Sequence, residues 1–494
     1  MYLKEITNKW DLSCSVPIPD VEVSGITENS KKVQNKYIFV SIPGEHSNGW
    51  AYIPEAIERG AIAIIGLPEL SDELVSLLKK KQIPYFAHEN PRRILGEVAH
   101  YLAGDPTKSM VVIGITGTNG KTTTTFLVES ILKEVGIRVA RFGTLGYDLG
   151  EQYVEATHTT PFNEELVALF SKAREKGITH VVMEVSSHSL AQDRVAGIHF
   201  SVAAFTNLTQ DHLDFHKTMD EYLKAKLKLF EMLSPEESFG VVNKSDPNSE
   251  HFIKQCKSKC ITYGTKGDYW ASDIEITIKD TKFQLHTPMG EIDIRLPLIG
   301  KHNISNALCA SAIVGGLGIS LKEIQRGLKN VKSVPGRFEM IDEGQEFTVV
   351  VDYAHTEDGL NHVLQTAQNL THGKLIVVFG CGGDRDKTKR PKMGAVAGKW
   401  ADLIVLTSDN PRTEDPKRIL LDIEVGVQKM GKEKGNDYFV IENREEAIQF
   451  ALSKAKANDI VIIAGKGHEP YQIIGTQKFP FDDREVARKF LKGK

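Results

Sequence analysis

The sequence has little cysteine, no long apolar run and almost no excess of charge, and each absence excludes a class of protein. Five cysteines among 494 residues are too few and too scattered for a disulfide framework. Cys256 and Cys260 have no second pair and no histidine couple nearby, so we expect no zinc site. No stretch reaches the roughly eighteen apolar residues of a membrane helix, and residues 1–5 lack the pattern of a signal peptide.

The formal net charge of −4 implies no domain-wide basic surface, so we expect no nucleic-acid partner. Hydrophobic residues make up 41% of the chain and charged residues 26%, which is ordinary for a globular protein with a sizeable core. These properties favour a cytoplasmic protein that inserts into no membrane. We also expect a monomer.

The length suggests about three domains, and apolar runs that alternate with helical patterns predict an α/β fold. We expect a small N-terminal α/β domain at 1–105, a central doubly wound domain at 106–333 and a C-terminal Rossmann-like domain at 334–494. In the first domain, strands are predicted near 37–42 and 61–65, with a helix over 53–59 between them.

The central block opens with an apolar, β-branched run over 110–116, which is typical of a strand buried on both faces. A Gly-rich turn and a helical pattern over 122–135 follow it. Further strands are predicted at 180–185, 202–205 and 239–243. Their alternation with helices indicates a parallel, doubly wound sheet. In residues 270–299, apolar and polar residues alternate one by one, as at 282–286. This pattern predicts a short antiparallel excursion.

The C-terminal block repeats the alternation of strand and helix and predicts a second doubly wound domain. Its expected strands are 347–351, 374–379, 402–406 and 459–464. Helical segments separate these strands, and the chain shows no tandem repeat, low-complexity tract or coiled-coil heptad.

The turn after the first central strand reads Thr116-Gly117-Thr118-Asn119-Gly120-Lys121-Thr122-Thr123. A strand, a Gly-rich turn and a helix in this order predict a phosphate-binding loop, because backbone N–H groups and the helix N-terminus attract phosphate oxygens. Lys121 adds a full positive charge, and the Thr122 hydroxyl is placed to bind Mg²⁺. Ile115 stands where such loops usually have glycine, so the loop is a variant. A Gly/Thr-rich turn without a ligand is the disfavoured alternative.

Three more residues of the central block are candidate metal or phosphate contacts. Glu184 ends an apolar strand, where a carboxylate suits Mg²⁺, although a surface glutamate is the alternative. His212 lies among carboxylates in 211–216, a cluster equally typical of loop hydrogen bonding. Lys226 lies in the apolar stripe of a helix over 218–233, where a buried lysine must find a partner, lose its proton or be modified. From the residues alone, a lysine that reaches the surface is the simpler explanation.

Ordered motifs identify a known family. In the central block they are TGTNGKTT at 116–123, HTTP at 158–161, EVSSH at 184–188, DHLD at 211–214 and KHNISN at 301–306. In the C-terminal block they are PGRFE at 335–339, DYAH at 352–355, GCGGDRD at 380–386, DNPR at 409–412 and GKGHE at 465–469. Through all three blocks the chain closely resembles the Mur ligases of bacterial cell-wall synthesis, and among them the branch that makes the muramyl tripeptide.

The resemblance implies an ATP-dependent, amide-forming ligase. It implies that ATP phosphorylates the D-glutamate γ-carboxylate of a UDP-linked muramyl dipeptide, and that an amine then attacks the acyl phosphate. Lys121, His212 and Lys226 are the implied catalytic residues, with Lys121 stabilising the transferred group. Glu184 and His212 would hold Mg²⁺, and Lys226 would be carbamylated by CO₂ to an anionic ligand. Further implied nucleotide contacts are Asn303 and Asn306 near adenine, Arg337 at a phosphate and Asp352 at the ribose.

The same resemblance implies two further substrate sites. The muramyl dipeptide is expected at Ser30, His158, Thr159, Thr160, Ser186, Gln192 and Arg194. The amino acid is expected at Arg385, Asp409, Asn410, Pro411, Arg412, Gly465 and Glu469. The segment 409–412 resembles the selector for meso-diaminopimelate, because Arg412 can bind the distal carboxylate that L-lysine lacks; a turn after a strand is the alternative. Closure of the domains is expected to bring the nucleotide and the amine together.

Four segments depart from the family pattern: Asn29-Ser30-Lys31 replaces Asp-Ser-Arg, Glu45-His46-Ser47 matches weakly, His302 replaces phenylalanine, and Glu357 replaces proline. The first removes a carboxylate and a bidentate donor from the expected UDP end. Other interpretations therefore stay open. One is an amide ligase with another acceptor or with L-lysine, including a folylpolyglutamate-synthetase-like enzyme. Another is a nucleotide-binding regulator, which the joint presence of the phosphate loop and candidate metal residues disfavours. A transporter ATPase is disfavoured because no membrane segment is visible.

Overall fold

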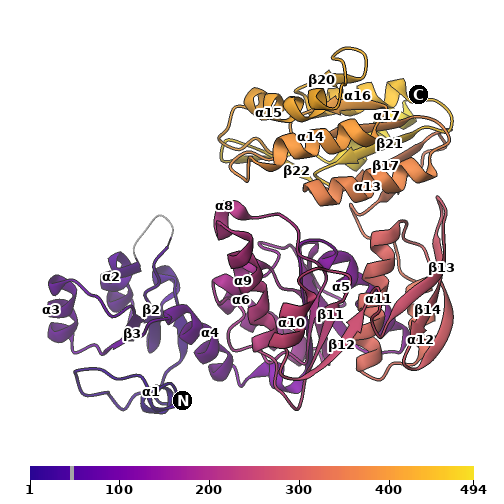
Figure 1. The fold of residues 1–494 in the computed structure, drawn as a ribbon. Helices are drawn as coiled ribbons and strands as arrows, with labels where there is room; N and C mark the ends of the chain where they lie inside the picture. Colours follow the sequence, from indigo (N-terminus) through magenta and orange to yellow (C-terminus); the bar gives the residue numbers. More distant parts are fainter. Residues whose placement is uncertain (45–48, 494) are drawn as a thin grey trace. The chain divides into compact units, whose positions relative to one another are not determined.

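The computed structural model describes residues 1–44 and 49–493, so the segment Glu45-His46-Ser47 lies outside the described residues. The chain has mixed α/β structure (Figure 1). It divides into two compact units. Unit 1 comprises 1–114, 138–202 and 232–238, and unit 2 comprises 115–137, 203–231 and 239–494. Within the described ranges, no helix is both long and apolar enough to cross a membrane.

The N-terminal part of unit 1 is built on a four-stranded parallel sheet of order β1-β2-β3-β4. Its strands are β1 (Gly25–Thr27), β2 (Tyr37–Val40), β3 (Ala61–Gly66) and β4 (Tyr85–Ala87). The helices are α1 (Leu3–Lys9), α2 (Ile53–Glu58), α3 (Asp72–Lys81) and α4 (Pro91–Leu102), with 3₁₀ turns η1 (Ser30–Lys32), η2 (Gly49–Tyr52) and η3 (Pro106–Ser109). Ile38 and Val40 enter one apolar cluster and Phe39 another, so both sheet faces are covered. The predicted α/β fold is confirmed here.

The central strands form an eight-stranded sheet of order β12-β11-β10-β5-β9-β6-β7-β8. They are β5 (Val111–Thr116), β6 (Val139–Gly143), β7 (Gly146–Asp148), β8 (Tyr153–Val154), β9 (His180–Glu184), β10 (Val202–Phe205), β11 (Phe239–Asn243) and β12 (Lys259–Tyr263). The associated helices are α5 (Lys121–Glu134), α6 (Asn163–Glu175), α7 (Ser187–Ala191), α8 (Leu213–His216), α9 (Met219–Glu231), α10 (Ser249–Gln255), α11 (Lys301–Gly316) and α12 (Leu321–Lys329). The predicted antiparallel excursion is confirmed as β13 (Trp270–Ile276), β14 (Thr281–Thr287) and β15 (Gly290–Leu296).

The C-terminal strands form a six-stranded sheet of order β16-β17-β21-β18-β19-β20, in which only the β16–β17 pair is antiparallel. The strands are β16 (Glu339–Ile341), β17 (Thr348–Asp352), β18 (Leu375–Phe379), β19 (Leu403–Leu406), β20 (Tyr438–Val440) and β21 (Ile460–Ala464). The hairpin β22 (Tyr471–Ile474) and β23 (Gln477–Pro480) forms a separate two-stranded sheet. The helices are α13 (Glu357–Leu370), α14 (Lys389–Trp400), α15 (Pro416–Lys429), α16 (Arg444–Lys454) and α17 (Asp483–Lys492).

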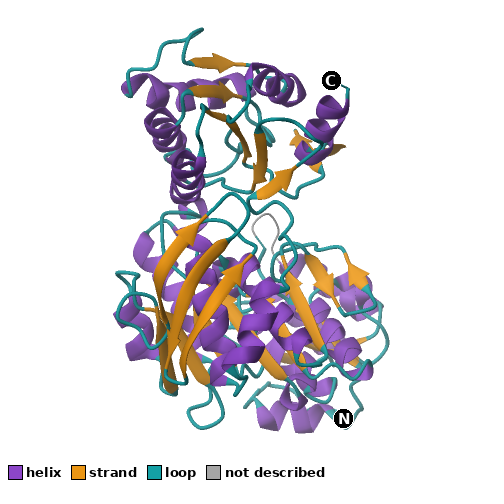
Figure 2. Cartoon of the chain, turned by 90° about the vertical axis from the view of Figure 1, so that its right-hand side faces the viewer, coloured by secondary structure: helices purple, strands orange, loops and turns teal. Residues whose placement is uncertain are grey.

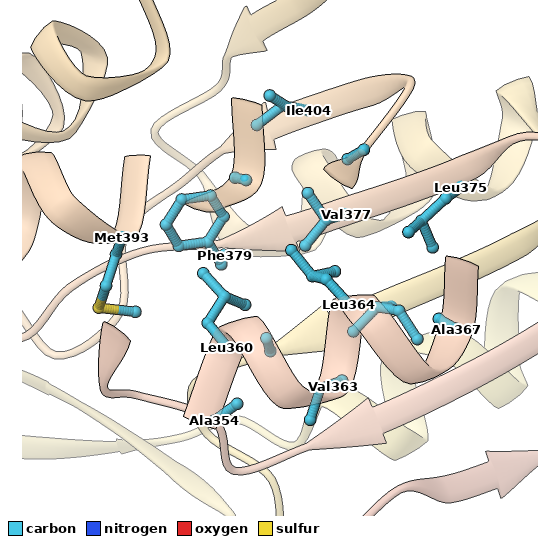
Figure 3. Packing of buried hydrophobic residues seen from close by; sticks show 14 of the residues in the cluster. Ala354, Leu360, Val363, Leu364, Ala367, Leu375, Val377, Phe379, Met393 and Ile404 are labelled. Carbon is cyan, nitrogen blue, oxygen red and sulfur yellow. The ribbon is translucent and has the colours of Figure 1, made fainter. Parts of the chain in front are cut away.

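Helices cover both faces of this C-terminal sheet (Figure 2). On α13, apolar residues recur at 360, 363, 364 and 367, which places them on one face of the helix. Figure 3 shows this face packed against Leu375, Val377 and Phe379 of β18. Residues of α16 and α17 join the apolar cluster on the other face. Because β17, β21, β18 and β19 are adjacent and parallel, the loops after them share one edge, where doubly wound sheets bind ligands.

Candidate active site

The predicted phosphate loop joins β5 to α5, and its backbone leaves no room for other residues at two positions. Gly117 and Gly120 have φ angles of 147° and 87°. A Cβ on Gly117 would lie 1.8 Å from the Thr206 hydroxyl oxygen, and a Cβ on Gly120 would lie 2.3 Å from the Asn306 side-chain oxygen. Since α5 begins at Lys121, the N–H groups of its first turn lie at the end of the loop, as in an anion site.

Two lysine side chains meet at this loop. The Lys121 Nζ donates to the carbonyls of Gly117 and Thr118, each at 2.8 Å. The Lys226 Nζ, on α9, donates to the same Gly117 carbonyl at 2.8 Å, and Lys226 is only 1% exposed. Burial, and then the charge of Lys121, lowers the pKa of Lys226 well below its usual value, while Asp211 acts in the opposite direction. The arrangement favours a neutral amine at Lys226.

A buried carboxylate, Asp211, lies beside the predicted metal ligand His212. Its Oδ2 lies 3.4 Å from the Nε2 of His212 and 3.9 Å from the Nε2 of His355, and its Oδ1 lies 3.9 Å from the Nζ of Lys389. Burial alone would raise the pKa of Asp211, but the charges of these three neighbours lower it overall. No role was predicted for Lys389 or His355. His355 is the last residue of the DYAH motif, and this motif could have indicated that it lies at the site.

The predicted adenine and phosphate residues in unit 2 also reach the loop. Asn306 touches Gly120, and its Nδ2 donates to the Asn303 Oδ1 at 3.0 Å. The Arg337 guanidinium donates to the Thr122 Oγ1 at 3.2 Å. Asp352 accepts hydrogen bonds from two backbone amides, those of residues 338 and 354, at 2.6 and 2.7 Å. Burial raises the pKa of Asp352.

In unit 1, the end of β9 gathers several residues predicted to contact the dipeptide. Glu184 is 1% exposed and accepts from the Thr144 backbone amide at 2.9 Å. The Thr160 hydroxyl donates to the Glu184 backbone carbonyl at 2.9 Å and accepts from the Ser186 amide at 3.0 Å. The Arg194 Nη1 donates to the Thr160 carbonyl at 3.3 Å. These contacts hold a threonine, a serine and an arginine around one strand end.

The other predicted dipeptide residues have structural partners in unit 1. Gln192 accepts from the Arg194 Nε and Nη2 at 2.9 and 2.6 Å. The Thr159 hydroxyl lies 3.1 Å from that of Thr144, and the His158 ring packs edge-on against Phe162. The Ser30 hydroxyl, in η1, donates to the Glu55 Oε2 at 2.6 Å. The Ser30 hydroxyl therefore already has a carboxylate partner.

Two guanidinium groups lie at the predicted selector in the C-terminal part of unit 2. The Arg412 Nη1 donates to the Gly383 carbonyl at 2.8 Å, and the Arg385 Nη1 donates to the Asp384 carbonyl at 3.0 Å. Across the described ranges, neither forms an ion pair with a carboxylate. Burial, and then the charge of Arg385, lowers the pKa of Arg412. Two cationic groups that bond only to carbonyls are suited to an external carboxylate.

Acidic groups stand at the neighbouring strand ends. Asp409 and Asn410 are buried, and the Asn410 Nδ2 donates to the Glu469 Oε2 at 2.9 Å. Gly465 has a φ of 114°, and a Cβ there would lie 2.8 Å from the Asp409 Oδ2. Pro411 contacts Gly383 closely, since a Cβ on Gly383 would lie 1.9 Å from the Pro411 carbonyl oxygen. The amino-acid residues predicted from the sequence thus come together, with anionic and cationic groups both present.

The fold and the loop define a class of protein: an α/β enzyme with a variant phosphate loop and a separate doubly wound domain. The family models of the Mur ligase middle domain and of the Mur ligase glutamate ligase domain match residues 115–314 and 336–467. Together they cover more than half of the sequence. The chain belongs to the Mur ligase family, whose members are ATP-dependent ligases that form amide bonds.

Relatives are similar over nearly the whole chain. A UDP-N-acetylmuramoyl-L-alanyl-D-glutamate–2,6-diaminopimelate ligase of Syntrophomonas wolfei is 44% identical, over 96% of each chain. The ligase of the same description from Bacillus licheniformis is 44% identical over 96% of this chain and 95% of its own. A solved structure of such a ligase is 31% identical, with a TM-score of 0.70 over 100% and 99% of the two chains. A Mycobacterium tuberculosis folylpolyglutamate synthase shares the fold, with 20% identity and a TM-score of 0.64 over 85% and 99%.

Proposed function

We propose that this chain adds meso-2,6-diaminopimelate to the D-glutamate γ-carboxylate of UDP-N-acetylmuramoyl-L-alanyl-D-glutamate, with ATP consumed through an acyl phosphate. The observation that carries the proposal is the charge pattern of the amino-acid site. Arg385 and Arg412 offer two guanidinium groups without a carboxylate partner, while Asp409 and Glu469 offer anions. This pattern suits an amino acid that has both an ammonium group and a second carboxylate. The names of the similar ligases support the same substrate.

The residues of the phosphate loop would bind ATP and stabilise the transferred phosphoryl group. The amides at the start of α5 and the Lys121 ammonium would neutralise charge as it develops on the phosphate oxygens. Arg337, which donates to Thr122, would contact a phosphate from the C-terminal part. Asn303 and Asn306 would contact adenine, and Asp352 would accept from a ribose hydroxyl.

Magnesium would be held by Thr122, Glu184, His212 and a carbamate on Lys226, and would neutralise phosphate charge. Within the described part of the chain, no three His, Cys, Asp or Glu residues are grouped to hold a metal ion. This fits Mg²⁺, which usually takes few protein ligands and completes its shell with phosphates and waters. Lys226 fits carbamylation because burial lowers the pKa of its amine, which would attack CO₂ and release a proton, and the product would be an anion beside a cationic loop.

The dipeptide would bind at Ser30, His158, Thr159, Thr160, Ser186, Gln192 and Arg194. Hydroxyl, amide and guanidinium donors suit its carboxylates and diphosphate. The γ-carboxylate would attack the γ-phosphate of ATP and release ADP, which leaves an acyl phosphate. The amine of diaminopimelate would then attack the acyl carbon, and phosphate and a proton would leave as the amide forms. We place this reaction in the cytoplasm, where ATP is available.

The experiment is a phosphate-release assay with Mg²⁺-ATP and the UDP-linked dipeptide, comparing meso-diaminopimelate, L-lysine and no amine. We expect release that depends on diaminopimelate, together with a product that mass spectrometry identifies as the tripeptide. Turnover with lysine but not with diaminopimelate would show that the selector is misassigned. No phosphate release with any acid and amine would leave only a nucleotide-binding role.

A further inference from the structure

Lys466, in the turn after β21, is a lysine with 0% of its surface exposed. The glycines on either side, Gly465 and Gly467, have φ angles of 114° and 55°. A Cβ on Gly467 would lie 2.7 Å from the Tyr353 Cβ, so the turn accepts no larger residue there. A buried ammonium group is costly unless it is paired, so its partners indicate its role.

Within the described residues, the hydrogen-bond and ion-pair partners of the Lys466 ammonium group belong to the amino-acid site. Its Nζ lies 3.0 Å from the Asn410 Oδ1, 3.2 Å from the Glu469 Oε2 and 3.7 Å from the Asp409 Oδ1. The Asn410 Oδ1 also accepts from the Ile473 backbone amide at 2.9 Å, and the Asn410 Nδ2 donates to Glu469. With Lys466 in place, only one orientation of the Asn410 amide satisfies all of these bonds. Lys466 thus joins the loop after β19 to the loop after β21.

We propose that Lys466 is a positioning residue that fixes Asn410 and Glu469 in the arrangement that receives the ammonium group of the incoming amino acid. This inference rests on the proposed function. Lys466 neutralises one of the two carboxylates, Asp409 and Glu469, so that the cluster keeps one negative charge for a cationic ligand. Without Lys466, Asn410 could turn, and Glu469 could take up a proton instead of the ligand's ammonium group.

Because Glu469 can take up a proton, the role of Lys466 should make binding of the amino acid depend on pH. Burial raises the pKa of Glu469, the charge of Asp409 raises it further, and Lys466 and Asn410 lower it. The charged and titratable groups that interact with Glu469 are Asp409, Lys466, Arg412, Arg444 and Tyr353. Removing Lys466 therefore raises the pKa of Glu469. Binding of the amino acid would then be weakest at low pH and would recover as the pH rises and Glu469 loses its proton.

The test compares Lys466→Met with Lys478→Met, a matched control on β23. Both lysines lie near the Tyr471 ring, at 5.8 and 4.3 Å, but Lys478 is exposed. KM is measured for ATP, for the UDP-linked dipeptide and for diaminopimelate, and kcat/KM for diaminopimelate is measured across pH. We expect Lys466→Met to raise KM for diaminopimelate on the order of 100-fold. The other two KM values should stay within about twofold, and the acid limb of the pH profile should move to higher pH.

Lys466→Arg retains the charge and should recover part of the affinity, which loss of packing alone would not predict. If Lys466→Met fails to fold, Lys466→Met with Glu469→Gln removes the partly buried carboxylate that has lost its ion pair. That double variant should have a high KM for diaminopimelate at every pH. The inference is overturned if Lys466→Met leaves KM for diaminopimelate and the pH profile unchanged, or raises all three KM values equally. Wild-type protein that uses no amine would instead overturn the proposed function, and this inference with it.

Discussion

Lys226 shows how burial changes the chemistry of one side chain. A lysine on an exposed helix face is a cation, whereas Lys226 lies 2.8 Å from the Gly117 carbonyl and next to the charge of Lys121, so its pKa falls. We expect Lys226→Ala to lower kcat by at least about 100-fold, because the proposed anionic ligand is lost. Phosphate release with all three substrates measures this.

Lys224 provides the control for that experiment, since it lies on the same helix but is exposed and paired with Asp220. Lys224→Ala should keep wild-type activity. Bicarbonate should not restore Lys226→Ala, because the variant has no amine to carbamylate. In wild-type protein, ¹³C-bicarbonate should give a carbamate NMR signal that the variant lacks. A fully active Lys226→Ala variant would end the carbamate proposal.

Arg412 tests the choice of amino acid at the same scale. Arg412→Ala should raise KM for diaminopimelate by about 100-fold, because the distal carboxylate loses its partner. The kcat/KM for diaminopimelate should therefore come closer to that for L-lysine. Assays with both amino acids measure the ratio of kcat/KM. Arg418→Ala, at an exposed position of α15, should change neither value. An unchanged ratio in Arg412→Ala would remove Arg412 from the selector.

At the scale of elements, α13 depends on its apolar face. Leu364 is 0% exposed and packs in the cluster between α13 and β18 (Figure 3). Leu364→Ala should reduce the free energy of unfolding of this part by about 2–5 kcal/mol, since it leaves a cavity. Trp400 fluorescence during urea unfolding reports the change, because its Nε1 donates to Asn361 of α13 at 2.8 Å.

The control for this substitution is Leu421→Ala on α15, where the side chain is 59% exposed. Its unfolding midpoint should stay close to that of the wild-type protein, because no buried contact is lost. Equal midpoints for Leu364→Ala and Leu421→Ala would show that the α13 face does not stabilise the fold as described.

The elements that the sequence predicted well are those buried on both faces. β17, β18, β19 and β21 read as continuous apolar runs, and the structure confirms each within one residue. The hairpin of β22 and β23 was not predicted, because all four residues of β23 are exposed and carry no apolar pattern. That hairpin holds the selector segment 409–412 in place, since the Arg412 amide donates to the Ile473 carbonyl at 3.1 Å.

At the site, too, features without a local sequence pattern were not predicted. Motifs located the phosphate loop, and Ile115 does not disturb it, because the two necessary glycines are Gly117 and Gly120. The cluster around Asp211 depends on contacts with Lys389, well over a hundred residues away in sequence, which no local pattern reveals. Lys466 went unassigned because a lysine between two glycines usually lies in solvent. The departure at Asn29 has a local role, since its side chain caps η1 by accepting from the Lys31 amide at 3.0 Å.

At the scale of the whole molecule, the proposed reaction needs a phosphorylated carboxylate and an amine that bind to different parts of the chain. An acyl phosphate is exposed to hydrolysis until the amine arrives, so closure of the domains around bound substrates should precede amide formation. Arg337 is suited to sense the nucleotide, because it extends from the C-terminal part and donates to Thr122 of the phosphate loop.

We therefore expect small-angle scattering to show a smaller radius of gyration when the UDP-linked dipeptide, diaminopimelate and a non-hydrolysable ATP analogue are present together. Arg337→Ala should bind the dipeptide as wild-type protein does but compact less, because the phosphate loses its contact from the C-terminal part. Its futile hydrolysis of ATP, measured as phosphate released without tripeptide, should rise relative to amide formation. No compaction of the wild-type protein at saturating ligands would mean that the amine reaches the acyl phosphate without domain closure.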